Sequence, residues 1–375
     1  MADCSLRFEI VAQDGAARRG RLTTPHGQVE TPVFMPVGTN ATVKMVPPEL
    51  LVQTGTAMVL ANAYHLSLRP GEQVVARLGG LHRFMNWSGP ILTDSGGYQV
   101  FSLAKLRRVT EEGVEFQSHV DGATMTVTPE RAMAIEEALG ADVIMAFDEC
   151  VAYPAELATA RAAMERTVMW AARCKAARCR TADQALFGIV QGSVFQPLRL
   201  ECIERLVQIG FEGYAIGGLS VGEGTALMNE VLAYTAAALP ADKPRYLMGV
   251  GPPEDILAAV AVGVDMFDCV MPTRNARSAC AFTRRGKVRL RNAKHREDAQ
   301  PIDPACGCLT CRSYSRAYLR HLFIAGEALA GTLTSLHNIW FYQDLMRGIR
   351  QAIEQGRLRE FAAGFLAEYE REDDD

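Results

Sequence analysis

The sequence predicts an α/β protein built on a (β/α)8 barrel, the TIM barrel, with a small N-terminal antiparallel sheet. Short apolar segments alternate with helical segments over about 250 residues, which is the pattern of that fold. A doubly wound open sheet is the competing fold, but no Gly-x-Gly-x-x-Gly motif follows the first strand. A cysteine-rich segment near the C-terminus, after the eighth strand, predicts an inserted zinc-binding subdomain.

The elements follow one another in a regular order. Three short segments predict the N-terminal sheet: Leu6–Ile10, Gly20–Thr24 and Gln28–Glu30. Eight apolar segments predict the barrel strands: Val33–Val37, Ala57–Ala61, Pro90–Thr93, Val143–Ala146, Leu186–Val190, Gly213–Ile216, Tyr246–Met248 and Val264–Phe267. Six helical segments fall between them: Pro48–Gln53, Pro129–Leu139, Glu156–Ala177, Leu198–Ile209, Ala226–Ala238 and Pro253–Val262. Thr128 and Pro129 form a helix start signal, and Arg107–Val127 alternates like a hairpin insertion after the third strand.

The composition is that of an ordinary globular enzyme. The 375 residues are 49% hydrophobic and 22% charged, and the formal net charge is −4. Charged residues near the start argue against a signal peptide, and no apolar run reaches the length of a membrane span. Ten scattered cysteines favour a reducing compartment over a disulfide framework. We therefore expect a cytoplasmic protein that makes no contact with a membrane.

Polar residues gather where the predicted strands end, and in a barrel that end carries the chemistry. Three aspartates and one amide lie there, beside several glycines: Asp94, Asp148, Asp268 and Gln191. Each aspartate alone could be a loop cap, but three at strand tips are less easily explained in that way. Glycines let a flat ligand approach the backbone, and carboxylates and amides read an edge of donors and acceptors. A purine base stacked between Tyr98 and Met248 fits this set.

Asp268 ends the last barrel strand and is followed closely by Arg274 and Arg277. A carboxylate in that position suits a nucleophile or a base, and the arginines suit a phosphate-bearing substrate. The alternative is an aspartate that only caps the following loop. The segment Arg274–Arg296 contains nine Lys or Arg residues and no Asp or Glu, which predicts a phosphate-binding surface that includes Arg284 and Arg285. The alternative there is a solvated basic loop.

Three cysteines within six residues predict a closed tetrahedral zinc site completed by a histidine: Cys306, Cys308, Cys311 and His337. His321 is a rival ligand. It falls in the middle of a predicted helix, Arg312–Leu329, and we expect ligands to flank elements rather than to lie at their centres. A redox relay is the alternative to a metal. With these boundaries the chain divides into a barrel with its N-terminal sheet (1–275), a basic loop with the zinc-binding subdomain (276–337), and C-terminal helices with an acidic tail (338–375).

Several motifs together resemble those of bacterial tRNA-guanine transglycosylase. They are Thr93-Asp94-Ser95-Gly96-Gly97-Tyr98-Gln99-Val100-Phe101-Ser102, Phe147-Asp148-Glu149-Cys150, Gly217-Gly218-Leu219-Ser220-Val221-Gly222-Glu223, Met271-Pro272-Thr273-Arg274-Asn275-Ala276-Arg277 and the Cys306–Cys311 cluster with His337. The resemblance runs from about Phe8 to Phe361. It implies exchange of the wobble guanine in GUN-anticodon tRNAs for 7-aminomethyl-7-deazaguanine, on the route to queuosine. It also implies a homodimer with one structural Zn²⁺ per subunit.

The resemblance also implies a role for each matching residue. Asp268 would be the nucleophile at ribose C1′, and Asp94 the general acid/base, which also contacts the base. The purine contacts would come from Tyr98, Asp148, Gln191, the Gly218 amide, the Leu219 carbonyl and Met248. Arg274 and Arg277 would lie near the uridines that flank the exchanged base. The chain departs from the family pattern at Ser278-Ala279-Cys280 and at Val151-Ala152, outside the residues with these roles.

Chemistry independent of the resemblance agrees with it. Replacing a base at one anomeric carbon with retention of configuration is naturally done by two inversions, with one carboxylate attacking and another managing a proton. The rival classes are a barrel zinc hydrolase, whose strand ends would need histidine clusters, and a pure RNA-binding module, which would not need carboxylates facing a polyanion. Within the superfamily, an archaeal-type or a queuine-using enzyme is the alternative. Val221 leaves less room for a bulky substituent than a glycine would.

The helix after the cysteines predicts self-association. Tyr314, Tyr318 and His321 recur at spacings of four and three and therefore share one helical face. Tyr and His suit a partly wet interface. The alternative is that this face packs onto the barrel as core.

Overall fold

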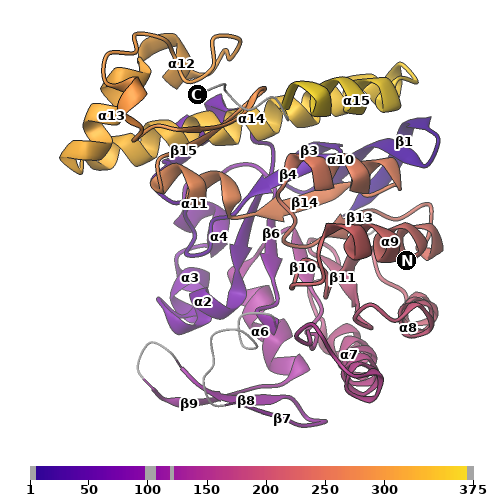
Figure 1. The fold of residues 1–375 in the computed structure, drawn as a ribbon. Helices are drawn as coiled ribbons and strands as arrows, with labels where there is room; N and C mark the ends of the chain where they lie inside the picture. The colour runs from indigo at the N-terminus through magenta and orange to yellow at the C-terminus, as the bar shows by residue number, and fades with distance from the viewer. Residues whose placement is uncertain (1–5, 98–106, 119–121, 370–375) are drawn as a thin grey trace.

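A computed structural model describes residues 6–97, 107–118 and 122–369 of the chain. Its centre is a parallel sheet of eight strands in the order β4-β14-β13-β12-β11-β10-β6-β5, and a bridge between Val37 and Leu60 brings the two edge strands together (Figure 1). The strands are β4 (Val33–Pro36), β5 (Val59–Asn62), β6 (Ile91–Asp94), β10 (Val143–Met145), β11 (Ala185–Val190), β12 (Gly213–Ile216), β13 (Arg245–Leu247) and β14 (Met266–Cys269). The predicted (β/α)8 barrel is confirmed.

Helices connect successive strands and surround the barrel. They are α1 (Pro48–Gln53), α2 (Ala63–Leu68), α3 (Glu72–Arg77), α4 (Gly80–Phe84), α6 (Pro129–Leu139), α7 (Leu157–Ala177), α8 (Gln196–Ile209), α9 (Thr225–Ala238) and α10 (Pro253–Ala261). The start signal of α6 works as predicted, because the Thr128 side chain accepts a hydrogen bond from the Arg131 amide and Pro129 occupies the first turn. The predicted insertion is a three-stranded sheet of β7 (Arg107–Val109), β8 (Val114–Gln117) and β9 (Thr124–Val127).

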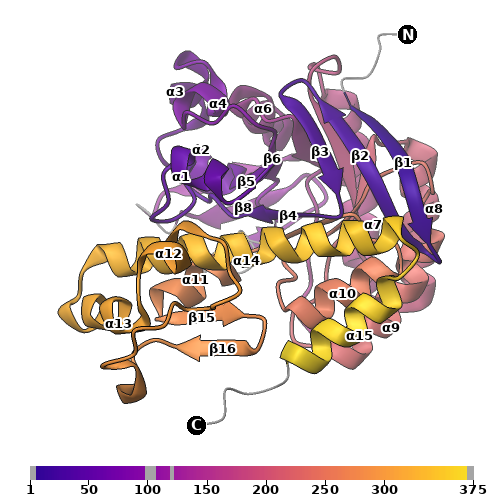
Figure 2. The ribbon, with the colours of Figure 1, turned by 90° about the horizontal axis from the view of Figure 1, so that it is seen from above.

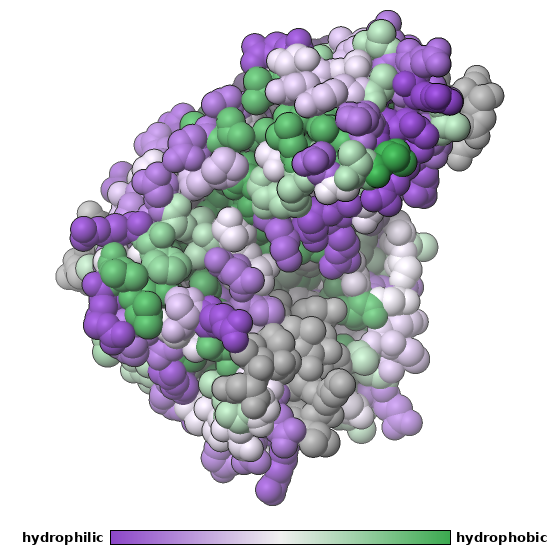
Figure 3. Space-filling model, turned by 90° about the vertical axis from the view of Figure 1, so that its left-hand side faces the viewer, coloured by the Kyte–Doolittle hydropathy of each residue, from purple (hydrophilic) through white to green (hydrophobic). Residues whose placement is uncertain are grey.

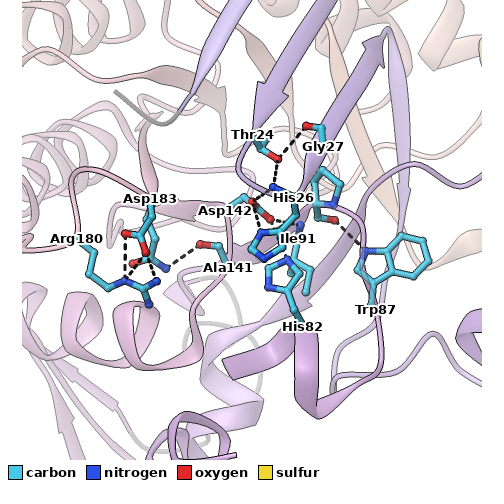
Figure 4. A network of polar contacts seen from close by, with 12 residues as sticks. Thr24, His26, Gly27, His82, Trp87, Ile91, Ala141, Asp142, Arg180 and Asp183 are labelled. Atoms are coloured by element: carbon cyan, nitrogen blue, oxygen red, sulfur yellow. Dashed lines mark hydrogen bonds and ion pairs between the residues drawn. The ribbon is translucent and has the colours of Figure 1, made fainter. Parts of the chain in front are cut away.

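The predicted N-terminal sheet is present and is tied to the end of the barrel where the strands begin. It consists of β1 (Arg7–Asp14), β2 (Ala17–Thr24) and β3 (Gly27–Thr31). Buried Arg18 of β2 forms an ion pair with buried Asp265, which precedes β14. The β2–β3 turn carries His26, whose Nδ1 lies 2.7 Å from Asp142 Oδ1, and His82 Nε2 lies 3.1 Å from Asp142 Oδ2 (Figure 4).

These two histidines hold the turn in place rather than form a second metal centre. Their rings are stacked, with centroids 3.5 Å apart and planes 13° apart, so the two ring planes, in which the nitrogen lone pairs lie, do not meet near a common point. Their distances to Asp142 are hydrogen-bond lengths. The same carboxylate accepts the amide hydrogens of His26 and Ile91, at 3.3 and 2.9 Å. Asp142 therefore fastens the N-terminal sheet to α4 and to the start of β6.

A cysteine module, residues 280–325, follows β14 and the short helix α11 (Met271–Arg277). It contains the hairpin β15 (Cys280–Thr283) and β16 (Gly286–Arg289), the 3-10 turn η1 (Ala293–His295), α12 (Leu309–Ser313) and α13 (Arg316–Ala325). Two expectations were wrong here. The basic segment is a helix and a hairpin rather than a loop. The single helix predicted at Arg312–Leu329 is broken, because Ser315 caps the start of α13 and left-handed Gly326 ends it.

The last two helices return to the barrel. Figure 2 shows α14 (Ala328–Glu354) running from the cysteine module to the N-terminal sheet, with α15 (Leu358–Tyr369) folded back beside α10. Gln343 of α14 donates a hydrogen bond to the Phe34 carbonyl of β4 at 3.0 Å. The division into residues 1–275, 276–337 and 338–375 stays a prediction, and α14 crosses its second boundary without a break. Among the described residues, no helix is both long and apolar enough to cross a membrane.

Candidate active site and metal centre

The strand ends enclose a cavity of about 520 Å³. The cavity brings together eight of the ten residues predicted to lie at the barrel rim or beside it: Asp94, Asp148, Gln191, Gly218, Leu219, Met248, Asp268 and Arg274. Arg277 is not among the lining residues. Tyr98 lies outside the described residues, so its predicted stacking role stays a prediction. Tyr246, Cys150 and Val221 also line the cavity.

Asp268 is buried at the C-terminal end of β14 and is held by one of its oxygens. Its Oδ1 accepts the Tyr246 hydroxyl at 2.6 Å and the Gly249 amide at 2.8 Å. Burial raises the pKa of Asp268, and these two donors oppose the rise. Burial and the neighbouring Asp268 and Asp94 carboxylates raise the pKa of Tyr246 well above its usual value, so the hydroxyl keeps its proton and remains a donor. This geometry orients the Asp268 carboxylate toward the cavity with one oxygen restrained.

Asp94 is buried at the end of β6 and is positioned by the neighbouring strand. Asn62, the last residue of β5, donates to Asp94 Oδ2 at 3.1 Å, while its own side-chain oxygen accepts the His65 amide and caps α2. Asn62 therefore both orients the Asp94 carboxylate and caps the start of α2. Sequence reasoning ended this strand at Ala61 and missed the residue, although a polar side chain at a strand end was the available signal.

Asp148 and Gln191 form a hydrogen-bonded pair at the ends of β10 and β11. Gln191 Nε2 lies 2.8 Å from Asp148 Oδ2, and the Ser95 hydroxyl lies 3.4 Å from Asp148 Oδ1. Burial raises the pKa of Asp148 to about 6. The cavity thus presents a carboxylate and an amide side by side, which is a set of groups that can read the edge of a planar heterocycle.

The backbone after β12 forms another wall of the cavity. Gly218 has φ +64°, and a β-carbon there would lie 2.5 Å from the Gln191 side chain, so only glycine fits. Arg199 of α8 donates to the Gly217 carbonyl at 3.0 Å from behind this wall. The Glu223 carboxylate accepts the amides of Ser220 and Val221. Sequence reasoning missed Arg199 because a lone arginine in an amphipathic helix gives no signal that it turns inward.

The cysteine cluster and His337 come together into a compact group that could hold a metal ion. His337 Nδ1 lies 3.6, 3.5 and 3.2 Å from the sulfurs of Cys306, Cys308 and Cys311. The other ring nitrogen, Nε2, lies 2.7 Å from the Phe282 carbonyl. Because a carbonyl can only accept, Nε2 carries the hydrogen and Nδ1 faces the sulfurs with its lone pair.

The choice of His337 over His321 as the fourth member of the cluster is confirmed. The reason given for it, that ligands flank helices rather than lie at their centres, was wrong. His337 lies well inside α14, and it reaches the sulfurs because that face of α14 is buried. His321 is exposed on α13.

The predicted RNA-binding arginines do not form one patch. Arg274 is exposed at the cavity, whereas Arg277 is half-buried on the same helix. Arg284 and Arg285 are exposed at the tip of the β15–β16 hairpin, where they line a separate depression of about 350 Å³ together with Arg316. The basic segment therefore offers cations at two places, the cavity mouth and the cysteine module.

Comparisons with known proteins agree with this site. The sequence profile of a family described as Queuine tRNA-ribosyltransferase matches residues 13–371. Proteins named Queuine tRNA-ribosyltransferase are 55% identical over 367 residues in Caldanaerobacter subterraneus subsp. tengcongensis and 58% identical over 361 residues in Desulforamulus reducens. These alignments cover 97% and 96% of this chain and 98% and 97% of those proteins. With a match over nearly its whole length, this chain belongs to the queuine tRNA-ribosyltransferase family.

Proposed function

We propose that this protein is a tRNA-guanine transglycosylase that exchanges the wobble guanine of GUN-anticodon tRNAs for 7-aminomethyl-7-deazaguanine. The observation that carries the proposal is the pairing, in one cavity, of an oriented carboxylate on β14 with a second carboxylate on β6 and a base-reading pair beside them. Family membership supports the reaction class. The specific incoming base and the tRNA set are part of the proposal.

Asp268 is the nucleophile in this mechanism. Tyr246 and Gly249 hold Oδ1, which leaves Oδ2 as the oxygen that attacks ribose C1′. The C1′–N9 bond breaks, its electron pair leaves with guanine, and a ribosyl-aspartate ester forms. Asp94 supplies a proton to the leaving base and takes one from the incoming base. The incoming nitrogen then displaces the Asp268 carboxylate from the opposite side, so the two inversions restore the original configuration.

The base is recognised by the remaining cavity groups. Ionised Asp148 accepts the N–H groups of the purine edge, while Gln191 and the Gly218 amide donate to the ring oxygen. The Leu219 carbonyl faces the aminomethyl group, and Met248 packs against one face of the ring, with Tyr98 proposed for the other. Flipping the nucleotide into this cavity costs less from an anticodon loop than from a duplex.

The metal held by the cysteine cluster is proposed to be a structural Zn²⁺. Zinc–sulfur bonds of about 2.3 Å and zinc–nitrogen bonds of about 2.1 Å at tetrahedral angles place sulfur and nitrogen about 3.6 Å apart. The observed sulfur–Nδ1 distances of 3.2 to 3.6 Å fit that geometry. Four protein ligands leave no open coordination position, which disfavours the alternative of a zinc hydrolase.

Transfer RNA is proposed to bind across both basic places. Arg274 lines the cavity, and Arg277 is half-buried on the same helix; both are proposed to contact the nucleotides that flank the flipped base. Arg284 and Arg285 bind backbone phosphates farther out. A cytoplasmic location and the preference for the bacterial-type base over queuine stay predictions.

A homodimer is proposed through the side that carries α13 and the start of α14. The prediction that Tyr314, Tyr318 and His321 share one helical face was wrong, because Tyr314 lies between α12 and α13. The rings of Tyr314 and Tyr318 nevertheless stack with centroids 5.5 Å apart, and Tyr318 is 39% exposed rather than packed into the barrel. Ile324 and Leu329 nearby are 61% and 43% exposed. Figure 3 shows hydrophobic residues on the upper part of this side, at the level of these helices. A second subunit would remove that apolar surface from water.

The test is incorporation of radiolabelled guanine into unfractionated tRNA by the purified protein. The wild-type protein should exchange guanine and form a denaturation-resistant protein–RNA adduct. Asp268→Asn should abolish both, while Asp94→Asn should still bind tRNA. Asp183→Asn, a change in a solvent-exposed ion pair with Arg180, is the matched control and should leave exchange intact. An adduct that maps by peptide mass to Asp94 would reverse the two roles, and no exchange by the wild-type protein would refute the function.

A further inference from the structure

A fully buried arginine lies directly behind the base-binding wall. The Arg199 guanidinium donates to three backbone carbonyls, those of Ser193 at 2.6 Å, Gly217 at 3.0 Å and Gly218 at 3.4 Å. Among the described residues, no carboxylate forms an ion pair with it, and its Nη1 has no hydrogen-bond partner. Burial lowers the pKa of Arg199 to about 10, which still leaves it protonated at neutral pH. A buried cation without an ion-pair partner is unfavourable for folding even when carbonyl oxygens accept its hydrogen bonds, so its position calls for an explanation beyond stability.

The explanation follows from the covalent structure of one peptide unit. The Gly217 carbonyl and the Gly218 N–H belong to the same planar amide. A cationic donor on the carbonyl oxygen draws electron density away from the nitrogen, which makes the N–H a stronger donor. Arg199 approaches this unit from α8, while Gly218 lines the cavity on the other side. The Arg199 charge thus polarises the Gly217–Gly218 amide, whose other side faces the site.

We propose that Arg199 is a positioning residue that polarises the Gly218 amide toward the ring oxygen of the bound base and stabilises the negative charge that this oxygen gains as the base leaves. The inference rests on the proposed function. When the C1′–N9 bond breaks, its electron pair delocalises over the purine, and the ring oxygen carries part of it. A donor aimed at that oxygen is stronger in the transition state than in the ground state and therefore accelerates the step.

The guanidinium also fixes the direction of this amide. By bridging Ser193 and Gly217, it ties the loop after β11 to the loop after β12. A planar fork can span two carbonyls in fixed directions, whereas a lysine ammonium acts as a point charge. Replacement by lysine should therefore keep the charge and lose part of the alignment.

The experiment compares Arg199→Gln, Arg199→Lys and a matched control, Arg245→Gln. Arg245 is also buried and also donates to backbone carbonyls, those of Leu239 at 2.8 Å and Gly263 at 3.3 Å, but it lies at the opposite end of the barrel. Each protein is assayed for kcat and KM in guanine exchange. Each is also assayed for its preference between guanine and 6-thioguanine, which keeps the ring N–H but offers a weaker acceptor in place of the oxygen.

In Arg199→Gln, kcat/KM should fall on the order of tenfold, less than the hundredfold or more seen when an oxyanion donor is removed outright. The preference of Arg199→Gln for guanine over 6-thioguanine should shrink. The preference of Arg199→Lys should lie between those of the wild type and Arg199→Gln, and Arg245→Gln should keep the wild-type preference. A folded Arg199→Gln with wild-type preference overturns the inference. If the glutamine variant does not fold, an unchanged preference in Arg199→Lys overturns it equally. Absence of guanine exchange by the wild-type protein would refute the proposed function instead, so the two failures are distinguishable.

Discussion

Replacing His337 by alanine should cost the cysteine cluster most of its metal affinity. His337 is fully buried, and its Nδ1 is the only nitrogen in a cluster of three sulfurs, all within 3.6 Å of it. A structural zinc site of four ligands binds with about 10–16 kcal/mol, so an equal share per ligand is about 2.5–4 kcal/mol. That share corresponds to a loss of roughly 10²- to 10³-fold in affinity. The change also leaves the Phe282 carbonyl without its donor, which adds about 1–3 kcal/mol of destabilisation.

The measurement is zinc competition against a chromophoric chelator of known affinity, together with metal analysis of the purified protein. Wild-type protein should retain one zinc per chain, and His337→Ala should release it at a chelator concentration that the wild type resists. The matched control is His321→Ala, because His321 is exposed on the neighbouring helix and should not affect retention. Full zinc retention by His337→Ala, with loss in His321→Ala, would refute the assignment.

Three further predictions concern the base, the RNA and the assembly. Because the ionised form of Asp148 binds the base and burial raises its pKa to about 6, the KM for guanine should rise as pH falls below that value, by roughly tenfold per pH unit; a KM that stays flat there contradicts the role. Replacing Arg284 and Arg285 together by alanine should weaken all tRNAs alike and lower the slope of log affinity against log salt by about two. A change in anticodon preference in that variant, with none in Arg277→Ala, would contradict the assignment of affinity to Arg284 and Arg285 and of selectivity to Arg277. Tyr318→Ala should sediment as a folded monomer if α13 forms the dimer interface, whereas an unchanged dimer would remove α13 from it.

Much of the barrel was predictable because its signal is local. Strand β11 is buried along its whole length and reads as a continuous apolar run, and the Thr128-Pro129 start of α6 contains its own capping chemistry. The tips of such strands meet at one end of a barrel by topology alone, so the shared cavity of Asp94, Asp148 and Asp268 followed from their positions in the sequence.

The parts that were missed depend on where side chains point after packing. Tyr246 looked like an ordinary strand residue, but its hydroxyl reaches across to Asp268. Arg199 turns inward only because the loops after β11 and β12 present carbonyls to it. In the cysteine module, helical periodicity continued through residues 312–329. The local stop signals at Ser315 and Gly326 divided that run into separate helices.

The hydrogen bonds of α14 have a consequence for synthesis on the ribosome. Gln343 and Arg350 donate hydrogen bonds to the carbonyls of Phe34 and Pro32, which lie 309 and 318 residues earlier in the chain. At about 5–20 residues per second, roughly 15–60 s separate the emergence of β4 from the emergence of the helix that covers it. During that interval, the carbonyl groups of β4 and of Pro32 that α14 will contact lack their native hydrogen-bond donors. The nascent chain is therefore exposed to misassembly until α14 has been synthesised, and removal of α14 would make that exposure permanent.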